Sequence, residues 1–289
     1  MQLLKRKIKT KTVVWSAVIL LLALLIIWTL WANTAVEMTV YEITSSRLPQ
    51  AFSGFRIAQI SDLHNDEMGK GNEALIRLLQ DAEPDIIVIT GDMIDSYDTH
   101  VDIAIAFAEE AVTIAPCYYV SGNHESRLAE YAELKDAFDR LGVTVLEDQT
   151  ATISRGEETI TIVGVIDPSF KTVYKTDDES AVLDDALTAI EHQDGEYTIL
   201  LSHRPEMFEI YAKHDIDLVF SGHAHGGQFR LPFVGGLFAP SQGLFPKYDA
   251  GVFTESNTSM VVSRGIGNSS FPIRFNNRPE LVLAVLTAE

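Results

Sequence analysis

Histidine and carboxylate side chains occur in two places along this sequence at a spacing suited to metal binding. His223 and His225 are separated by one residue and directly follow an apolar run. Asp62 and His64 follow another apolar run with the same separation. Alternate side chains of an extended segment share one face, so each pair can present two ligands to one side. Imidazole and carboxylate groups suit transition metals, although either pair alone would equally fit a polar turn.

Three more polar blocks stand in the same position relative to apolar runs: Gly91-Asp92, Gly122-Asn123-His124-Glu125 and Ser202-His203-Arg204. Each follows a run rich in apolar residues that predicts a buried strand. Open α/β sheets place their binding sites at the carboxyl ends of strands. The repetition of this arrangement is stronger evidence for a common site than any single block.

The elements that must position these blocks alternate between helix and strand. Apolar residues at helical spacing predict helices over 72–83, 101–115, 128–141, 181–191 and about 206–213. Apolar runs predict strands over 36–43, 55–60, 85–90, 118–120, 143–147, 197–201, 216–220, 260–263 and 281–286. A hairpin predicted over 151–166 adds antiparallel strands, so the sheets should be mixed.

Two segments show no helical or strand period. Residues 171–180 are polar and predicted to form an exposed loop. Residues 231–251 contain Gly, Pro and several aromatic side chains, and we expect a long loop there. Loops of this length inside a compact domain are often functional.

The first 32 residues differ from the rest of the chain. Five basic residues stand within residues 1–12, and residues 13–32 carry no charge. Twenty helical residues span about 30 Å, the thickness of the bilayer's hydrocarbon core, so residues 13–32 are predicted to form a transmembrane anchor. Trp28 and Trp31 suit the interfacial aromatic belt, and the basic flank should stay cytoplasmic. The alternative is a cleaved signal peptide, for which the apolar run is long.

The remaining domain, expected over 36–289, is strongly acidic. The whole chain has 22 Lys and Arg against 41 Asp and Glu, and without the five N-terminal bases the formal charge is −24. Binding to nucleic acid usually needs a basic surface, so no nucleic-acid partner is expected. Cys117 is the only cysteine, which excludes an intrachain disulfide. It lies in an apolar run and is expected to be a buried core residue.

Taken in order, the five blocks resemble the calcineurin-like metallophosphoesterase family over about residues 55–286. Two C-terminal stretches resemble the membrane-anchored YkuE-type branch and some UDP-2,3-diacylglucosamine pyrophosphatases: Arg264-Gly265-Ile266-Gly267 and Pro272-Ile273-Arg274. The family implies a four-layer α/β/β/α sandwich with two mixed sheets. It also implies a site for two divalent or trivalent metal ions, which would be Mn, Fe or Zn.

The resemblance also implies a role for each block residue. One ion would be held by Asp62, His64 and His225, and the other by Asn123, His203 and His223. Asp92 would bridge the two ions. His124 would remain free beside the leaving group, as a general acid or electrostatic stabiliser, and Glu125 stands where many members have Asp and would orient His124.

Two arginines are candidates for binding substrate phosphate. Arg204 follows His203 directly, and Arg264 opens the C-terminal glycine-containing stretch. A guanidinium group can bind two phosphate oxygens at once. Each arginine could equally form a structural ion pair within the fold.

The resemblance implies a membrane-anchored, extracytoplasmic, dinuclear metal-dependent phosphoesterase. Its substrate would be a phosphorylated small molecule or lipid, and the bond a phosphodiester, pyrophosphate or phosphomonoester. One alternative is a UDP-2,3-diacylglucosamine-type pyrophosphatase, but its substrate is made on the cytoplasmic side and the predicted topology opposes this. A non-catalytic receptor or scaffold with the same fold is the alternative of another class, and it should have lost ligands that are present here.

Overall fold

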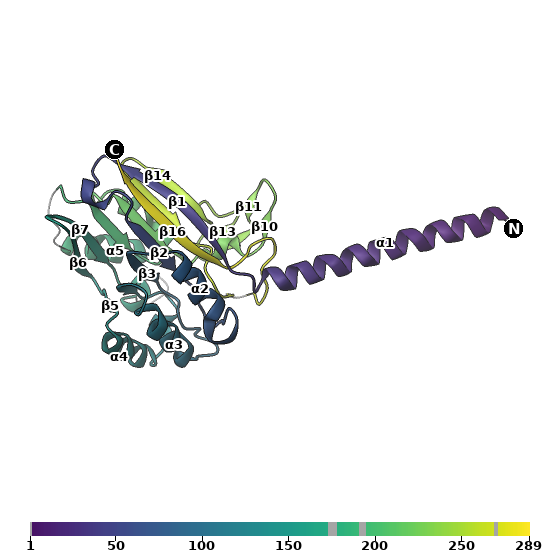
Figure 1. Ribbon diagram of the computed structural model, residues 1–289, viewed down its shortest axis with the longest axis horizontal. Coiled ribbons are helices and arrows are strands. Elements are labelled where there is room, and N and C mark those ends of the chain that lie inside the picture. Colours follow the sequence, from purple (N-terminus) through teal and green to yellow (C-terminus); the bar gives the residue numbers. More distant parts are fainter. Residues whose placement is uncertain (1, 173–177, 191–194, 269–270) are drawn as a thin grey trace.

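The protein consists of one long N-terminal helix and a domain built from two packed sheets (Figure 1). A computed structural model describes residues 2–172, 178–190, 195–268 and 271–289. Its helices are α1 (Gln2–Ala32), α2 (Glu73–Asp81), α3 (Val101–Ala111), α4 (Tyr131–Leu141), α5 (Glu179–Ala189) and α6 (Phe208–Tyr211). Half of the predicted loop 171–180 lies outside the described residues.

The first sheet has the strand order β1-β16-β2-β3-β4-β5. Its strands are β1 (Glu37–Ser45), β2 (Arg56–Ile60), β3 (Ile86–Thr90), β4 (Cys117–Val120), β5 (Thr144–Val145) and β16 (Glu280–Ala288). Strands β2 to β5 are parallel neighbours, with Ile60 opposite Ile89 and Thr90 opposite Val120. Strand β16 pairs antiparallel with β2 and parallel with β1, so the sheet is mixed as predicted.

The second sheet has the strand order β14-β15-β9-β8-β7-β6. Its strands are β6 (Gln149–Arg155), β7 (Glu158–Gly164), β8 (Thr198–Leu201), β9 (Leu218–Ser221), β14 (Gly251–Glu255) and β15 (Thr258–Val262). The predicted hairpin forms β6 and β7, and β7, β8, β9 and β15 are parallel. Strand β14 was not anticipated by the sequence pattern.

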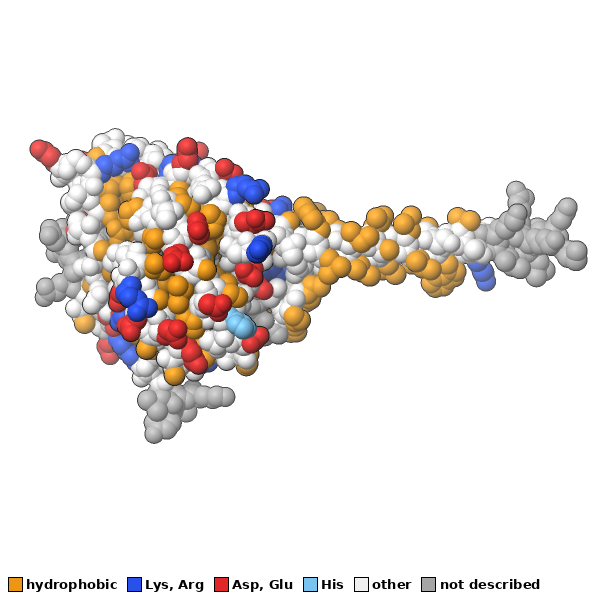
Figure 2. All heavy atoms as spheres, turned by 60° about the horizontal axis from the view of Figure 1, so that its bottom comes forward, with side chains coloured by type: hydrophobic (Ala, Val, Ile, Leu, Met, Phe, Trp, Pro, Cys, Tyr) orange, Lys and Arg blue, Asp and Glu red, His pale blue; other side chains and the backbone are white. Residues whose placement is uncertain are grey.

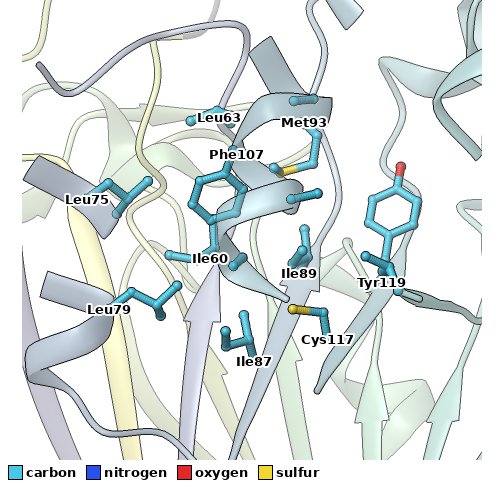
Figure 3. Close-up of a cluster of buried hydrophobic side chains, with 14 of the residues drawn as sticks. Ile60, Leu63, Leu75, Leu79, Ile87, Ile89, Met93, Phe107, Cys117 and Tyr119 are labelled. Carbon is cyan, nitrogen blue, oxygen red and sulfur yellow. The ribbon is translucent and has the colours of Figure 1, made fainter. Parts of the chain in front are cut away.

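The layers are joined by three groups of buried apolar side chains. Helices α2, α3 and α4 pack on the outer face of the first sheet, where Leu75, Leu79 and Phe107 contact the strand residues Ile87 and Ile89 (Figure 3). A second group fills the space between the sheets, and a third lies between the second sheet and helices α5 and α6. The fold is therefore the expected four-layer α/β/β/α sandwich.

The segment 231–251 is more ordered than the loop predicted there. It contains two short antiparallel pairs, which β10 (Arg230–Leu231) forms with β11 (Gly235–Gly236) and β12 (Phe238–Ala239) forms with β13 (Gly243–Leu244). Two-residue strands carry too little periodicity to be recognised from sequence. The prediction of a structureless loop was wrong here.

Helix α1 extends away from the domain, and residues 13–31 of it carry many exposed apolar side chains (Figure 2). Thr10–Ala32 is long and apolar enough to cross a membrane. Only 6% of its most apolar stretch is buried against the protein, so this helix is not a core element of the domain. The predicted basic flank, residues 1–12, is mostly part of the same helix, since α1 begins at Gln2.

Candidate metal centre

The blocks singled out by sequence converge where the strands of both sheets end. Asp62 follows β2, Asp92 follows β3, and Asn123 follows β4 in the first sheet, whereas His203 follows β8 and His223 follows β9 in the second. Close packing of the two sheets brings these strand ends together. Every proposed ligand is nearly inaccessible, with no more than 6% of its surface exposed.

One set of potential ligands consists of Asp62, His64 and His225. One ligand atom from each lies within 4.8 Å of the other two. The Nε2 atom of His225 is 3.3 Å from the Asp62 carboxylate. The Nδ1 atom of His64 lies 3.1 Å from the Asp95 carboxylate, and a proton shared there leaves Nε2 free to bind a metal.

The other set consists of Asp92, His203 and His223, again with ligand atoms within 4.8 Å of one another. The Nδ1 atom of His203 lies 2.7 Å from the carbonyl oxygen of Thr90, which only accepts hydrogen bonds. The Nδ1 atom must therefore carry the proton, and His203 Nε2 is the nitrogen available to a metal. It lies 3.2 Å from Nδ1 of His223.

The Asp92 carboxylate lies between the two sets. Its Oδ2 atom is 3.5 Å from Nε2 of His64 and 3.2 Å from Nε2 of His203. One oxygen is thus close to a free imidazole nitrogen from each set. A carboxylate in this position can contact two neighbouring cations at once.

The backbone of the site adopts an uncommon conformation. Five of the seven candidate ligands have positive φ angles between 47° and 65°: Asp62, His64, Asp92, His223 and His225. Asp, Asn and His enter this left-handed region more readily than most residues, but the conformation still costs free energy. Such conformations persist where the surrounding structure enforces them, and they cluster at functional sites.

Two glycines allow the loops after β4 and β9 to pass close to the Asp92 and Asp62 carboxylates. A Cβ atom on Gly122 would lie 2.3 Å from Oδ1 of Asp92, and one on Gly222 would lie 2.4 Å from Oδ2 of Asp62. Neither contact is sterically possible. Glycine is therefore required before Asn123 and before His223 if the Asp92 and Asp62 carboxylates are to occupy their observed positions.

Burial and neighbouring charges shift the pKa values of this cluster. Although burial acts to lower it, the charge and hydrogen bond of Asp92 raise the pKa of His203 to about 10. Burial would raise the pKa of Asp92, but His203 and His64 hold it well below its usual range. Burial, with nearby cationic groups, keeps the pKa values of His223 and His225 well below 6.5. Both are neutral imidazoles, the form that ligates metals.

His124 stands beside the ligands but belongs to neither set. Its Nδ1 atom accepts a hydrogen bond of 3.0 Å from the backbone N–H of Ser96, which leaves the proton of the neutral ring on Nε2. Burial lowers the pKa of His124 to about 4. In this structure His124 is therefore a neutral hydrogen-bond donor, which differs from the expected imidazole that titrates near neutral pH.

Asp95 is a functional residue that the sequence reasoning missed. Its carboxylate lies 3.1 Å from Nδ1 of His64 and 3.7 Å from Nδ1 of His124, and the three side chains form a cluster within 4.8 Å. The hydrogen bond to His64 and the nearby histidine charges lower the pKa of Asp95 to about 2, against the effect of burial. The sequence signal that could have identified Asp95 is its position three residues after Asp92, in the same turn after strand β3.

Glu125 does not orient His124, contrary to expectation. Its carboxylate accepts hydrogen bonds from the backbone N–H groups of Asp92, Met93, Ile94 and Gly122, at 2.7–3.3 Å. The extra methylene carries the carboxylate past the imidazole and beneath the turn after β3. Burial, with repulsion from Asp92, raises the pKa of Glu125 to about 7.

Arg204 reaches the site and also forms a buried ion pair. Its Nε and Nη2 atoms donate to the two carboxylate oxygens of Asp167 at 2.6 and 3.0 Å. Its Nη1 atom donates to Ser241 Oγ at 3.2 Å, and both residues line the pocket above the site. Arg204 therefore forms a structural ion pair and also lines the pocket.

Arg264 forms the structural ion pair that the sequence analysis left open as an alternative to phosphate binding. Its Nη2 atom donates to Glu37 at 2.7 Å and to Glu280 at 2.8 Å, which joins β1 to β16. Another arginine, Arg274, is 1% exposed and lies 3.3 Å from Nδ1 of His225. Arg127, also missed, lines the pocket beside His124.

Two buried atoms test whether this cluster fits metal ions. Nε2 of His64 and Oδ1 of Asn123 are inaccessible and have no hydrogen-bond partner among the described residues. Leaving such groups unpartnered destabilises a fold by about 1–3 kcal/mol each. Both atoms are of types that bind metals: Nε2 of His64 lies 3.5 Å from the Asp92 carboxylate, and Asn123 lines the same pocket as Asp92, His223 and His225. The donor set therefore fits divalent metal ions.

Comparison with known proteins identifies the family. The family model for calcineurin-like phosphoesterases matches residues 55–227, which contain all seven candidate ligands. The chain belongs to this family. The uncharacterized metallophosphoesterase YkuE of Bacillus subtilis is 30% identical over 87% of this chain and 85% of its own length.

Two further similarities agree with this assignment. A bovine protein described as a transmembrane protein with metallophosphoesterase domain is 28% identical over 87% of this chain, which spans 57% of that protein. The crystal structure of TT1561 of Thermus thermophilus matches 74% of this chain and 91% of its own, with a TM-score of 0.51 and 15% identity. That last similarity concerns the fold alone.

Proposed function

We propose that this protein is a membrane-anchored, dinuclear metal-dependent phosphoesterase. The position of Asp92 Oδ2, between the free nitrogens of His64 and His203, is the observation that carries the proposal. One ion would be held by Asp62, His64 and His225, and the other by Asn123, His203 and His223, with Asp92 shared. This division agrees with the two spatial sets and uses the otherwise unpartnered Asn123 Oδ1.

Two ions held in this way lower the pKa of a bound water and neutralise charge on phosphoryl oxygens. The reaction breaks one P–O ester bond as a water oxygen forms a new bond to phosphorus. His124 would donate a hydrogen bond from Nε2–H to the leaving oxygen, because Ser96 fixes the opposite nitrogen as an acceptor. Arg204 would bind a phosphoryl oxygen while Asp167 holds its guanidinium group in place.

The pocket above the site is small. Its volume is about 200 Å³, and its lining includes Asn123, His124, Arg204 and Ser241. Pockets that enclose whole drug-sized ligands have volumes of about 300–1,000 Å³. This pocket would therefore hold the phosphoryl group, while the rest of the substrate extends over the surrounding surface.

We further propose that residues 13–32 anchor the chain with its N-terminus in the cytoplasm and the domain of residues 36–289 outside. The basic residues before the apolar run support this orientation through the positive-inside rule. Protease added to intact spheroplasts should then remove the domain. Complete protection until the cells are lysed would reverse the topology.

Hydrolysis assays on the purified full-length chain test the proposed activity. Mn²⁺, Zn²⁺ or Fe²⁺ would be added to metal-depleted protein with a diester, a monoester and a pyrophosphate as substrates. We expect metal-dependent release of product from at least one of the three. Tight metal binding with no hydrolysis of any substrate would instead favour a non-catalytic receptor or scaffold.

A further inference from the structure

Large apolar side chains are exposed at the end of the domain from which α1 emerges. We call this surface the apolar rim; it consists of Leu231, Phe233, Val234, Phe238, Leu244, Phe245, Phe271 and Ile273. Between 38% and 109% of each side chain is exposed. Strands β10, β11 and β13, which carry or flank most of these residues, lie beside the C-terminal end of α1 (Figure 1). Exposed apolar surface of this kind marks an interaction site.

Direct contacts place part of the rim at the level of the membrane span. The ring of Phe275, two residues after rim residue Ile273, contacts Trp28 edge-on with centroids 6.1 Å apart. Asn33 exchanges hydrogen bonds of 2.7 and 2.8 Å with the backbone of Arg274. Trp28 precedes the end of the span at Ala32 by four residues, or about 6 Å along the helix. The segment 271–275 therefore lies beside the last turn of the span.

The scarcity of acidic side chains around the rim also favours a bilayer as its partner. Residues 228–250 and 264–279 contain a single acidic residue, although the whole chain has 41 Asp and Glu. Their arginines are paired or buried: Arg230 pairs with Asp249, Arg264 and Arg278 pair with Glu37, and Arg274 is 1% exposed. Acidic side chains are spread instead over the domain face seen in Figure 2. An acidic surface is repelled by anionic lipid headgroups, whereas a surface with few acidic groups is not.

The rim is also continuous with a wall of the pocket. Pro240 and Ser241 line the pocket and lie between β12 and β13. The same two strands carry the exposed rim residues Phe238 and Leu244. A surface that contacted the rim would therefore border the pocket mouth.

We propose that the apolar rim inserts into the interfacial layer of the bilayer that α1 spans, so that the pocket acts on phosphate groups of membrane-resident amphiphiles. Aromatic and aliphatic side chains flanked by basic residues are the usual composition of such interfacial surfaces. The bilayer is the required neighbour of any surface that contacts Trp28, if α1 crosses a membrane. The substrate part of this inference rests on the proposed phosphoesterase function, whereas the docking part does not.

Fluorescent labelling tests the docking directly. The chain's own cysteine, Cys117, is 1% exposed, and burial raises its pKa to about 12, so thiol reagents will spare it. Phe233→Cys and Leu244→Cys would carry an environment-sensitive label in the full-length chain, reconstituted in phosphatidylcholine–phosphatidylglycerol nanodiscs. Glu157→Cys is the control, because the β6–β7 turn lies on the side of the domain away from α1 (Figure 1).

Lipids brominated along their acyl chains should quench the labels at residues 233 and 244 at least two-fold more than the label at residue 157. Aqueous iodide should show the opposite order. Quenching by iodide at all three positions would overturn the proposal. Protection from both quenchers at residues 233 and 244 would show that a protein, such as a second copy of the chain, covers the rim instead.

A pair of substrates with the same reacting atoms tests the substrate class. Hexadecyl and ethyl p-nitrophenyl phosphate differ only in the alkyl chain that can enter the bilayer. We expect the nanodisc-bound protein to hydrolyse the hexadecyl ester with at least ten-fold higher kcat/KM, and Phe233→Asp to lower that ratio at least three-fold. A ratio near one would overturn the assignment of substrate class. If neither ester is hydrolysed, the phosphoesterase proposal fails, while the labelling result still decides the docking.

Discussion

The candidate metal centre and the apolar rim depart from the usual distribution of side chains in opposite directions. The seven candidate ligands are polar and no more than 6% exposed, whereas the eight rim residues are apolar and at least 38% exposed. Folded domains normally bury apolar groups and expose polar ones. Because both departures oppose stability, each is best explained by a partner that the chain alone does not supply. The partners that we propose are a pair of cations at the metal centre and a bilayer at the rim.

The two regions also differ in how they are supported. The ligands stand at the ends of strands whose residues are fully buried, and backbone hydrogen bonds to the Glu125 carboxylate hold one of their turns. The rim stands on two-residue strands at the domain surface. A reaction centre needs fixed geometry, whereas an interfacial surface needs only to present apolar area.

The largest expected effect comes from Asp92→Asn. An amide is neutral and bridges two cations poorly, so both ions should be lost and hydrolysis should fall by more than about 10⁴-fold, beyond the usual effect of one acid–base group. Asp81→Asn is the matched control, since Asp81 is exposed at the end of α2. Elemental analysis and turnover would be measured on both variants. Two retained ions with normal turnover in Asp92→Asn would refute the shared carboxylate.

His124→Ala should separate chemistry from assembly. His124 is not a proposed ligand, so the variant should retain both ions while turnover falls by about 10²–10⁴-fold. The loss should be greater for an alkyl ester than for a nitrophenyl ester, because the alkoxide carries more charge as it leaves. His100→Ala, at an exposed position, is the control. Loss of metal from His124→Ala would show that this residue is a ligand or a structural support.

Glu125→Gln should act on the turn beneath the site. At about pH 8.5, above the raised pKa of Glu125, the four backbone N–H groups would lose an anionic acceptor. Hydrogen bonds to charged groups contribute about 1.5–3 kcal/mol each. We expect the free energy of unfolding to fall by about 2–4 kcal/mol in chemical denaturation. Glu130→Gln, at a nearby exposed position, should change it by less than about 0.5 kcal/mol. Equal stabilities for the two variants would contradict the supporting role.

Phe233→Ser should have the smallest effect on folding. The side chain is fully exposed, so removing it opens no cavity and leaves no polar group unpartnered. The free energy of unfolding in detergent should change by less than about 0.5 kcal/mol. A loss above about 1 kcal/mol would mean that Phe233 packs against the protein, and the contrast between the two regions would weaken.

Much of the fold and the site's ligand blocks could be predicted because each ligand follows a buried strand. The apolar runs before Asp62, Asp92 and His223 mark strands β2, β3 and β9. The alternation of strands, helices and one hairpin predicted mixed pairing, whereas the arrangement in two packed sheets came from the family resemblance. The assignment of ligands to each ion came from the family resemblance. The structure groups Asp62 with His64 and His225, and it groups Asp92 with His203 and His223.

The errors concern residues whose partners are distant in sequence. Arg264 pairs with Glu37, 227 residues away, and only the parallel pairing of β1 with β16 brings them together. The Glu125 side chain contacts backbone groups after β3, and no local pattern reveals this. Asp95 was overlooked because a turn that contains one ligand does not indicate whether a second carboxylate in it also faces the site.

Counting the metal ions on the full-length chain tests the central claim most directly. Protein purified in detergent would be depleted of metal, titrated with Mn²⁺ and measured by isothermal titration calorimetry together with elemental analysis. The account predicts two ions per chain for the wild type, with hydrolysis appearing only when the second ion is bound. A single ion per chain at saturation, with full hydrolytic activity, would contradict it.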